Sequence, residues 1–541
     1  KTVGAANGLA TAVIGAVGDD AQATFAETVQ IGTITILSGE ASGENSSATF
    51  AKAVTGNIVM TDGADAASHA LLNFTGQTAA TALSGTITTT KTDADDTLVT
   101  ITDAGGGAAA AQTFTGQIGT ATHKIASVTV GAADGNAGIA IFDEDVFVTA
   151  LNIISDNASG ELSKVTLNND LTATTIVLNK DSNDATLIIA GTNTTIAGTI
   201  DGAATGEGIL QITGAGTTIS GEVGVGTTDL SAIDVNATTT FSAKTEAVAY
   251  TVDADTTFTG TVLANTGTTI GTSGTDVILT AASNTGVTAL AASTTLTANN
   301  TLATVATTLA AGSTLTANGV MTTTGDVTVT SGTLNLNVAS NVIDHLILVG
   351  TAEVYVDKSI ASGATINTSS TIDGAGSFAS TSKIKIASTI ASGDTLVLVD
   401  SGGFDAAGGG QTETTTAVAI DLILQDTALI NYSAGVTDGT TITITANDKT
   451  SSTVATELGV SSNAAKAAQQ VMQAAIANVT TGDTAAYTAF DNAMRGEGGL
   501  SATADTDLAL QVAPQSDTIS GSSIATRAMT GTVQGIVSNR M

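Results

Sequence analysis

The sequence predicts an all-β protein, a long parallel β-solenoid followed by a small α-helical C-terminal region. The first observation behind this prediction is a repeat. Three similar segments, Thr295–Asn299, Thr314–Asn318 and Thr333–Asn337, recur at a constant 19-residue interval. A fixed period of about 20 residues is typical of a solenoid, in which each turn buries its apolar face only by stacking on the next turn.

The second observation is a column of apolar residues. Counting backwards from Leu334 by the same interval reaches Leu315, Leu296, Val277 and Phe258. Each of them lies within a polar–apolar alternation, which places alternate side chains on one face of a strand. We therefore expect one short strand per period and one interior column. The general preference for right-handed crossovers predicts a right-handed solenoid.

The third observation is the composition. Of the 541 residues, 42% are hydrophobic, 12% charged and 3% aromatic, and the chain has no Cys, no Trp and one Pro. Val, Ile, Leu and Ala suit a narrow core, and Thr suits the outer face of a pleated sheet. The hydrophobic fraction argues against a disordered chain, and collagen would need Gly at every third position. The absence of Cys excludes disulfides and thiolate metal sites.

The charge of the chain is strongly acidic. It carries 49 Asp and Glu against 15 Lys and Arg, for a formal net charge of −34. This charge disfavours nucleic acid and anionic membrane surfaces as partners. It fits a protein that stays soluble in salt or one that binds cations. Residues 245–357 contain eight acidic residues and neither Lys nor Arg.

Residues 1–23 form a small, apolar N-terminal segment. Within it, Lys1–Gly18 mixes Val, Ile and Ala with several Gly residues. We interpret the segment as a strand that caps the first turn, or alternatively as a strand donated to a neighbouring subunit. Because the sequence begins with Lys and not with Met, we expect a mature, processed chain whose export signal has been removed.

Residues 24–453 are predicted to form the solenoid body. Its first part repeats a phenylalanine after Thr or Asn, at Phe25, Phe50, Phe74 and Phe114. The spacings are unequal, and the longest one, from Phe74 to Phe114, predicts turns with inserted loops. Between residues 141 and 230 the alternating segments recur about every 10 residues, half a typical solenoid period, which suggests two strands per turn. Near the end of the body, Ile420–Leu424 is predicted to be a strand.

Residues 454–541 change period and are predicted to be α-helical. Ser461 begins a helix, Ala464–Val479 is rich in Ala and Gln, and Thr484–Met494 forms a second helix. We expect these helices to cover the last turn of the solenoid, because an uncovered sheet edge pairs with other chains.

The C-terminal region resembles the linker of bacterial autotransporters. The resemblance rests on the helical pair, on Leu510–Pro514 and on a closing helix of small residues that ends in Val537–Arg540. In that family the linker joins a β-helical passenger to an outer-membrane barrel, and this sequence contains no barrel strands. The Thr-, Ala- and Gly-rich body is also similar in composition to S-layer proteins. The resemblance implies an extracellular protein on a bacterial cell surface.

Candidate catalytic residues are few. The three histidines, His69, His123 and His345, lie far apart in the sequence, and none has an acid and a nucleophile arranged as in a triad. No phosphate-binding or dinucleotide-binding fingerprint is present. We therefore predict no catalytic and no cofactor-binding residues, and we interpret the histidines as ordinary surface or core residues.

Carboxylates are the remaining candidate ligands. Asp253 and Asp255 are separated by one residue, as are Asp143 and Asp145, so that on a strand each pair points to one side. Each pair offers oxygen ligands to Ca²⁺. Because Ca²⁺ takes about six to eight oxygens, loop carbonyls or a neighbouring subunit would have to supply the rest. The alternative interpretation is that these side chains are solvated acids.

The expected function is structural and non-enzymatic. We expect a secreted bacterial surface protein that assembles with copies of itself into a filament, sheath or S-layer-like coat. One alternative is a monomeric autotransporter adhesin that contacts cell-surface glycans or the outer membrane. Another is a β-solenoid enzyme that degrades polysaccharides. The enzyme is disfavoured because the chain has no Trp, and no aromatic residue between Phe258 and Tyr355, to stack on sugars.

Overall fold

The computed structural model describes most of the chain up to residue 470. The described residues are 9–16, 19–39, 43–61, 68–77, 79–90, 97–103, 110–132, 136–155, 162–180, 183–356, 366–368, 379–386, 392–401, 413–426, 430–437, 441–459, 461–463, 465–466 and 469–470. The predicted helices beyond residue 470, including the segments that resemble an autotransporter linker, lie outside them. The chain divides into two compact units, Lys1–Val305 and Ala306–Met541.

The first unit is built from short strands joined by turns. In chain order they are β1 (Leu9–Ile14), β2 (Gln22–Phe25), β3 (Val29–Leu37), β4 (Ser46–Phe50), β5 (Val54–Thr61), β6 (Ala70–Gln77), β7 (Thr81–Ser84), β8 (Ile87–Thr89), β9 (Thr97–Asp103), β10 (Ala111–Phe114), β11 (Ile125–Val130), β12 (Ile139–Phe142), β13 (Val146–Ile154), β14 (Lys164–Leu167), β15 (Leu171–Asn179), β16 (Thr186–Ile189), β17 (Thr195–Gly202), β18 (Ile209–Ile212), β19 (Thr217–Ile219), β20 (Leu230–Val235), β21 (Thr239–Phe241), β22 (Thr245–Val252), β23 (Thr256–Phe258), β24 (Val262–Ile270), β25 (Asp276–Leu279), β26 (Ser283–Asn284), β27 (Val287–Leu290), β28 (Thr295–Ala298) and β29 (Leu302–Thr304).

The second unit continues with strands and ends with two helices among them. Its elements are β30 (Ala306–Leu309), β31 (Thr314–Ala317), β32 (Met321–Thr323), β33 (Asp326–Thr330), β34 (Thr333–Leu336), β35 (Asn341–Val342), β36 (His345–Val349), β37 (Glu353–Val356), β38 (Ile366–Thr368), β39 (Lys383–Ile386), β40 (Thr395–Ser401), α1 (Glu413–Ile423), β41 (Ile430–Thr437), β42 (Thr441–Asp448) and α2 (Ser451–Leu458).

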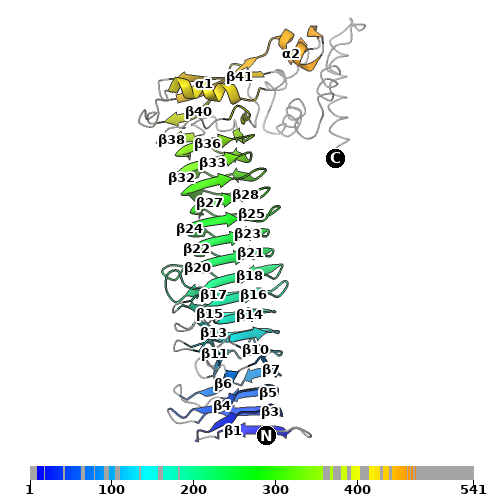
Figure 1. Ribbon diagram of the computed structural model, residues 1–541, viewed down its shortest axis with the longest axis vertical. Coiled ribbons are helices and arrows are strands. Elements are labelled where there is room, and N and C mark those ends of the chain that lie inside the picture. Colours follow the sequence, from blue (N-terminus) through cyan, green and yellow to red (C-terminus); the bar gives the residue numbers. More distant parts are fainter. Residues whose placement is uncertain are drawn as a thin grey trace. The chain divides into compact units, whose positions relative to one another are not determined.

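Successive turns of the first unit stack in parallel (Figure 1). On one face β13 pairs with β15 and β15 with β17, while on another face β14 pairs with β16 and β16 with β18. Each strand is thus bonded to the strand one turn before it and to the strand one turn after it, with side chains aligned in columns. This arrangement is a parallel β-solenoid and confirms the predicted fold class. In this stretch it also has the two strands per turn that the spacing suggests.

The 19-residue turns contain three strands each, so the prediction of one strand per period is wrong. In the second unit β31 pairs with β34, β32 with β35 and β33 with β36, all in parallel. Leu315 lies opposite Leu334 in the first of these pairs, and both are fully buried. Of the other two strands of each turn, β33 and β36 have five residues and alternate between buried and exposed positions. β32 and β35 have only three and two residues, which is too short to show an alternation.

One pairing in the predicted interior column is shifted by two residues in the first unit. Val277 lies opposite Leu296, as predicted, and both are buried. Phe258, however, lies opposite Leu279, two positions beyond the predicted partner Val277. This turn is therefore slightly longer than the repeating period. Because side chains alternate between the two faces of a strand, a shift by two positions leaves Phe258 facing the interior.

Phenylalanines fill the first part of the interior. Phe25, Phe50 and Phe74 are in register on one face, with neighbouring ring centroids 4.9 and 5.7 Å apart. Phe114 does not continue this column, because it lies in β10 of the other sheet and meets Phe74 edge-on at 5.2 Å. The long spacing between Phe74 and Phe114 therefore includes a change of face. The loops that the sequence predicts in this interval, over residues 91–96 and 103–111, lie almost entirely outside the described residues.

The second unit ends in an antiparallel arrangement. β40 pairs in parallel with β38 and antiparallel with β42, and β42 forms an antiparallel hairpin with β41. Helix α1 packs against β41 (Figure 1). The hairpin therefore covers the edge of the last parallel strand. The helices that the sequence predicts for this role, in residues 464–494, lie almost entirely outside the described residues.

Helix α1 corrects a further prediction. The sequence predicts a strand over Ile420–Leu424, whereas the chain is helical there up to Ile423. Ile420 and Ile423 are buried, while Leu422 between them is 77% exposed. Burial at every third position is the periodicity of a helix, and the β-branched composition of the segment obscures it.

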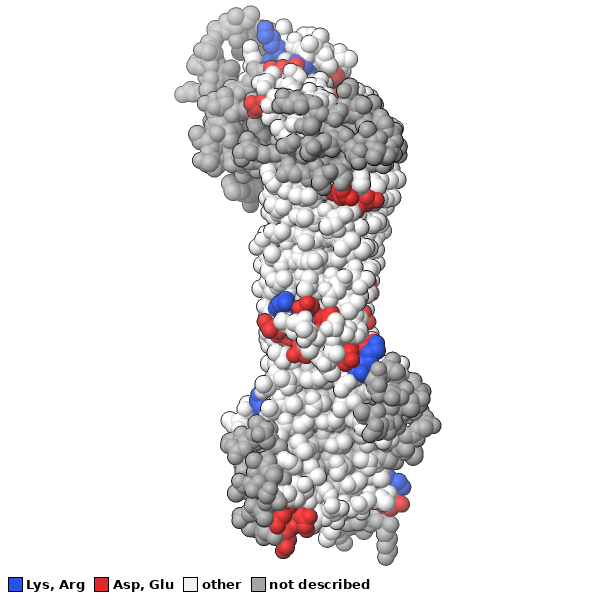
Figure 2. All heavy atoms as spheres, turned by 90° about the vertical axis from the view of Figure 1, so that its left-hand side faces the viewer, with Lys and Arg blue, Asp and Glu red and all other residues white. Residues whose placement is uncertain are grey.

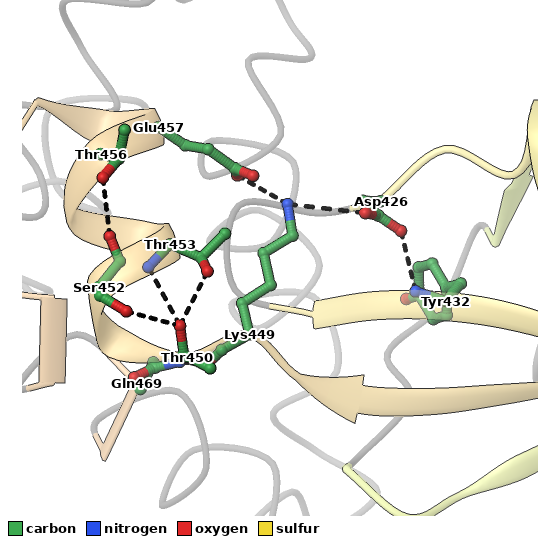
Figure 3. A network of polar contacts seen from close by, with 9 residues as sticks. All are labelled: Asp426, Tyr432, Lys449, Thr450, Ser452, Thr453, Thr456, Glu457 and Gln469. Carbon is green, nitrogen blue, oxygen red and sulfur yellow. Dashed lines mark hydrogen bonds and ion pairs between the residues drawn. The ribbon is translucent and has the colours of Figure 1, made fainter.

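A polar network joins α2 to the hairpin (Figure 3). The ammonium group of Lys449 lies 2.7 Å from the Glu457 carboxylate in α2 and 3.7 Å from the Asp426 carboxylate, and its side chain is 8% exposed. The Thr450 hydroxyl caps the start of α2 by accepting the backbone N–H of Thr453 at 3.2 Å. In the part of the chain that the structure describes, no helix is long and apolar enough to cross a membrane.

Candidate functional site

On the face that Figure 2 shows, the charged side chains of the described residues are sparse and gather in a few groups. The predicted ligands Asp253 and Asp255 lie in the turn between β22 and β23, not on a strand. Asp253 accepts a hydrogen bond from the Thr272 hydroxyl at 3.0 Å, and Asp255 accepts the backbone N–H of Asp276 at 2.9 Å. Each carboxylate is therefore directed to a different residue of the following turn.

The second predicted pair has a similar setting. Asp143 and Asp145 lie in the turn between β12 and β13, and the Asp143 carboxylate accepts the side-chain amide of Asn168 at 2.8 Å. The carbonyl of Asp145 accepts the backbone N–H of Ile118 at 3.0 Å. Among the described residues, neither pair belongs to a group of three side chains close enough to hold one metal ion. Both pairs link neighbouring turns of the solenoid.

A shallow depression lies on the outer face of β21, β23 and β25. Its volume is about 400 Å³, and Asp255 and Asp276 are its acidic members. The rest of its lining is mostly threonine, namely Thr217, Thr238, Thr239, Thr240, Thr256 and Thr257, with Gly216 and Ile278. Hydroxyl groups and two carboxylates favour a hydrated or polar ligand over an apolar one, because apolar ligands need a mainly hydrophobic lining.

Two buried carboxylates are not predicted from the sequence. Asp229 is 2% exposed and accepts the side-chain amide of Asn265 at 2.5 Å. Glu246 is 7% exposed, and its carboxylate lies 3.0 Å from the ammonium group of Lys244. Burial raises the pKa of the nearby Tyr250 phenol, and the charges of these two carboxylates raise it further. Each carboxylate also accepts a backbone N–H from the preceding turn, of Gly206 for Asp229 and of Gly226 for Glu246, so we assign both of them to holding turns together.

A third group brings together residues that the sequence analysis does not connect. Asp326, Asp344 and His345 each offer one ligand atom within 4.8 Å of the other two, and they are the only such group among the described residues. Nδ1 of His345 lies 3.1 Å from Oδ1 of Asp326 and 3.3 Å from Oδ2 of Asp344. The signal that could have found this group is the repeat itself, because Asp326 and His345 are separated by the same interval as Leu315 and Leu334.

The first strand presents a candidate interface. Among the described strands, β1 pairs with β3, with Leu9 opposite Ile31 and Ile14 opposite Ile36. It is therefore part of the first turn of its own chain, which fits the interpretation of the N-terminal segment as a cap. Leu9 and Val13 on this strand are 51% and 61% exposed. β1 lies at the end of the first unit (Figure 1), so its second edge adjoins no described strand.

Three comparisons with known proteins give no relative: no family model, no curated protein and no solved structure matches this chain. The function is therefore inferred from residues and geometry alone.

Proposed function

We propose that this protein is a non-enzymatic structural protein of a bacterial cell surface, and that its copies associate through strand β1. The observation that carries this proposal is the outer edge of β1. Backbone N–H and C=O groups on a sheet edge pair with another strand unless they are covered. The exposed side chains of Leu9 and Val13 on the same strand add apolar area that association would bury.

A terminal strand of the second unit supports this proposal, because its edge is covered whereas the outer edge of β1 is not covered by any described strand. In the second unit the last parallel strand, β40, is covered by β42 of the antiparallel hairpin. The chain thus uses a hairpin and a helix to protect one terminal strand. No described element gives β1 similar protection, which is expected of a strand that another copy of the chain covers.

The composition supports a structural role outside the cell. A chain without Cys has no thiols to oxidise. Only 12% of the residues are charged, and threonine supplies much of the polar outer face. The net charge of −34 opposes close contact between copies. Association therefore has to come from short-range contacts such as backbone pairing, which a strand edge provides.

The test compares two matched substitutions in the full chain. Val13→Lys places a charge on the outer edge strand, and Val287→Lys places the same charge on β27, where Val287 is 48% exposed within the solenoid. Light scattering and negative-stain microscopy measure the assemblies, and circular dichroism checks the fold. We expect the wild type and Val287→Lys to form assemblies and Val13→Lys to remain monomeric with an unchanged β spectrum.

Two results would contradict the proposal. A wild-type chain that stays monomeric at all concentrations would favour the adhesin alternative. Assemblies of Val13→Lys that are as abundant as those of the wild type would show that β1 is not the contact.

A further inference from the structure

We propose that Asp326, Asp344 and His345 form a binding site for one divalent transition-metal ion, for which Zn²⁺ is the probe. The three side chains come from two neighbouring turns of the solenoid. Asp326 and His345 are direct partners in the ladder between β33 and β36, and Asp344 lies in the bend that leads into β36. This site is separate from strand β1 and independent of self-association.

The spacing of the ligand atoms fits a tetrahedral ion. When ligand bonds are about 2.0–2.1 Å long, neighbouring ligand atoms around a tetrahedral Zn²⁺ lie about 3.3 Å apart. Nδ1 of His345 lies 3.1 Å from Oδ1 of Asp326 and 3.3 Å from Oδ2 of Asp344. The oxygens of Asp326 and Asp344 lie within 4.8 Å of each other. An ion among the three atoms therefore needs a side-chain movement only where these two oxygens are too far apart.

The backbone holds the ligands in place before an ion binds. Asp326 and His345 are fixed by the parallel ladder, which aligns their side chains on one face. The backbone N–H of Asp344 donates to the Thr323 hydroxyl at 3.2 Å, and that hydroxyl donates to the carbonyl of Gly325 at 2.9 Å. Thr323 is 4% exposed, so this support is buried beneath the ligands. A preorganised ligand set loses less entropy when the ion binds.

The donor types select the class of ion. One imidazole nitrogen and two carboxylate oxygens are ligands that Zn²⁺ and similar first-row ions accept, with water in the remaining position. Ca²⁺ requires about six to eight oxygens and does not favour imidazole. The side chains of Asp326, His345 and Asp344 are 54%, 31% and 25% exposed, which leaves access for the ion and its waters.

The charge of the surroundings also favours a cation. Two carboxylates converge here, and the sequence from Ala306 to Val356 contains neither Lys nor Arg. No Lys or Arg of this stretch balances the two carboxylates, and a bound metal ion would do so. The alternative is a hydrogen-bonded group of the three side chains without an ion, so a test has to separate the two.

The experiment titrates the chelator-treated full chain with ZnCl₂ in an isothermal calorimeter. We expect one Zn²⁺ per chain in the wild type and at least about a tenfold loss of affinity in His345→Gln and in Asp326→Asn, because each removes a ligand. His123→Gln is the matched control, since His123 contacts the Thr122 hydroxyl at 2.9 Å on another turn. This control should bind Zn²⁺ as the wild type does, and CaCl₂ should give no comparable binding.

A second measurement does not depend on the folding of any variant. In the wild type, Zn²⁺ should shift the imidazole NMR signals of His345, and Ca²⁺ should leave them unchanged. If Zn²⁺ leaves these signals unmoved, or if His345→Gln binds Zn²⁺ as tightly as the wild type, the three residues form only a hydrogen-bonded group and the proposal is wrong.

Discussion

The interior of the solenoid is filled in two different ways. In the first unit, Phe50 and Phe74 stack in one column and are fully buried, and in the second unit Leu315 and Leu334 hold in-register inward positions. The turns differ in length too, because the step from Phe50 to Phe74 is longer than the step from Leu315 to Leu334. Turn length alone does not decide between the two kinds of filling, because Phe241 and Phe258 also stack in register across a step of only 17 residues, with ring centroids 4.8 Å apart. The interior is filled by whichever inward side chains together reach native packing density.

The difference shows what parallel stacking does and does not fix. Register places each inward side chain on the equivalent position of the next turn, whatever the length of the connecting loop. Turn length is therefore free to vary, because the loops between the strands absorb the difference and leave the inward positions in register. The solenoid accommodates both of the turn lengths compared above in this way.

The largest expected effect comes from placing a charge in the aliphatic column. Leu315→Asp buries an unpaired carboxylate at a fully buried position between neighbouring turns, so we expect a loss of at least about 4 kcal/mol in the free energy of unfolding. Urea denaturation followed by circular dichroism measures it. Thr314→Asp, which changes the partly exposed neighbour on the same strand, is the control and should cost far less. Equal effects of the two substitutions would show that Leu315 does not face the core.

The aromatic column should be most sensitive at its middle. Phe74 contacts the rings of both Phe50 and Phe114, so Phe74→Ala leaves a cavity on two sides and should cost about 3–5 kcal/mol. Phe25 is partly exposed and contacts one aromatic ring, that of Phe50. Phe25→Ala should therefore lower the free energy of unfolding by less than Phe74→Ala does. Denaturant midpoints of the two variants give the comparison. A larger effect at Phe25 would mean that the column does not pack as a continuous stack.

The sequence predicts the columns better than it predicts the turns. The 19-residue period correctly places Leu315 opposite Leu334, because large apolar residues recur there in a clear alternation. The same period does not reveal β35, whose two residues, Asn341 and Val342, carry no periodic signal. Helix α1 is missed for a different reason, because its Val, Ile and Thr residues are typical of strands and only tertiary packing makes them helical.

The candidate metal site is predictable in part. The 19-residue period that aligns Leu315 with Leu334 also aligns Asp326 with His345, so this pair could have been predicted from the sequence. Asp344 was not, because on a regular strand it would point away from His345, and only the bend before β36 turns its carboxylate back. The buried carboxylate of Asp229 carries no local signal, since its partner Asn265 lies two turns further along the chain.

The last prediction tests whether the two interiors differ in width, and its expected effect is the smallest. Leu334→Phe introduces into the 19-residue turns the ring that fills the longer ones. If the interior is narrower there, the ring has to displace Leu315 and Val354, which lie directly opposite on the adjacent turns, and the cost should be about 1–3 kcal/mol. Leu334→Met keeps the volume and is the control, with an expected cost below about 1.5 kcal/mol. Denaturant midpoints measured for both variants decide the question. A phenylalanine that is tolerated as well as methionine would mean that the interior at Leu334 has room for a ring, as it has at Phe50 and Phe74.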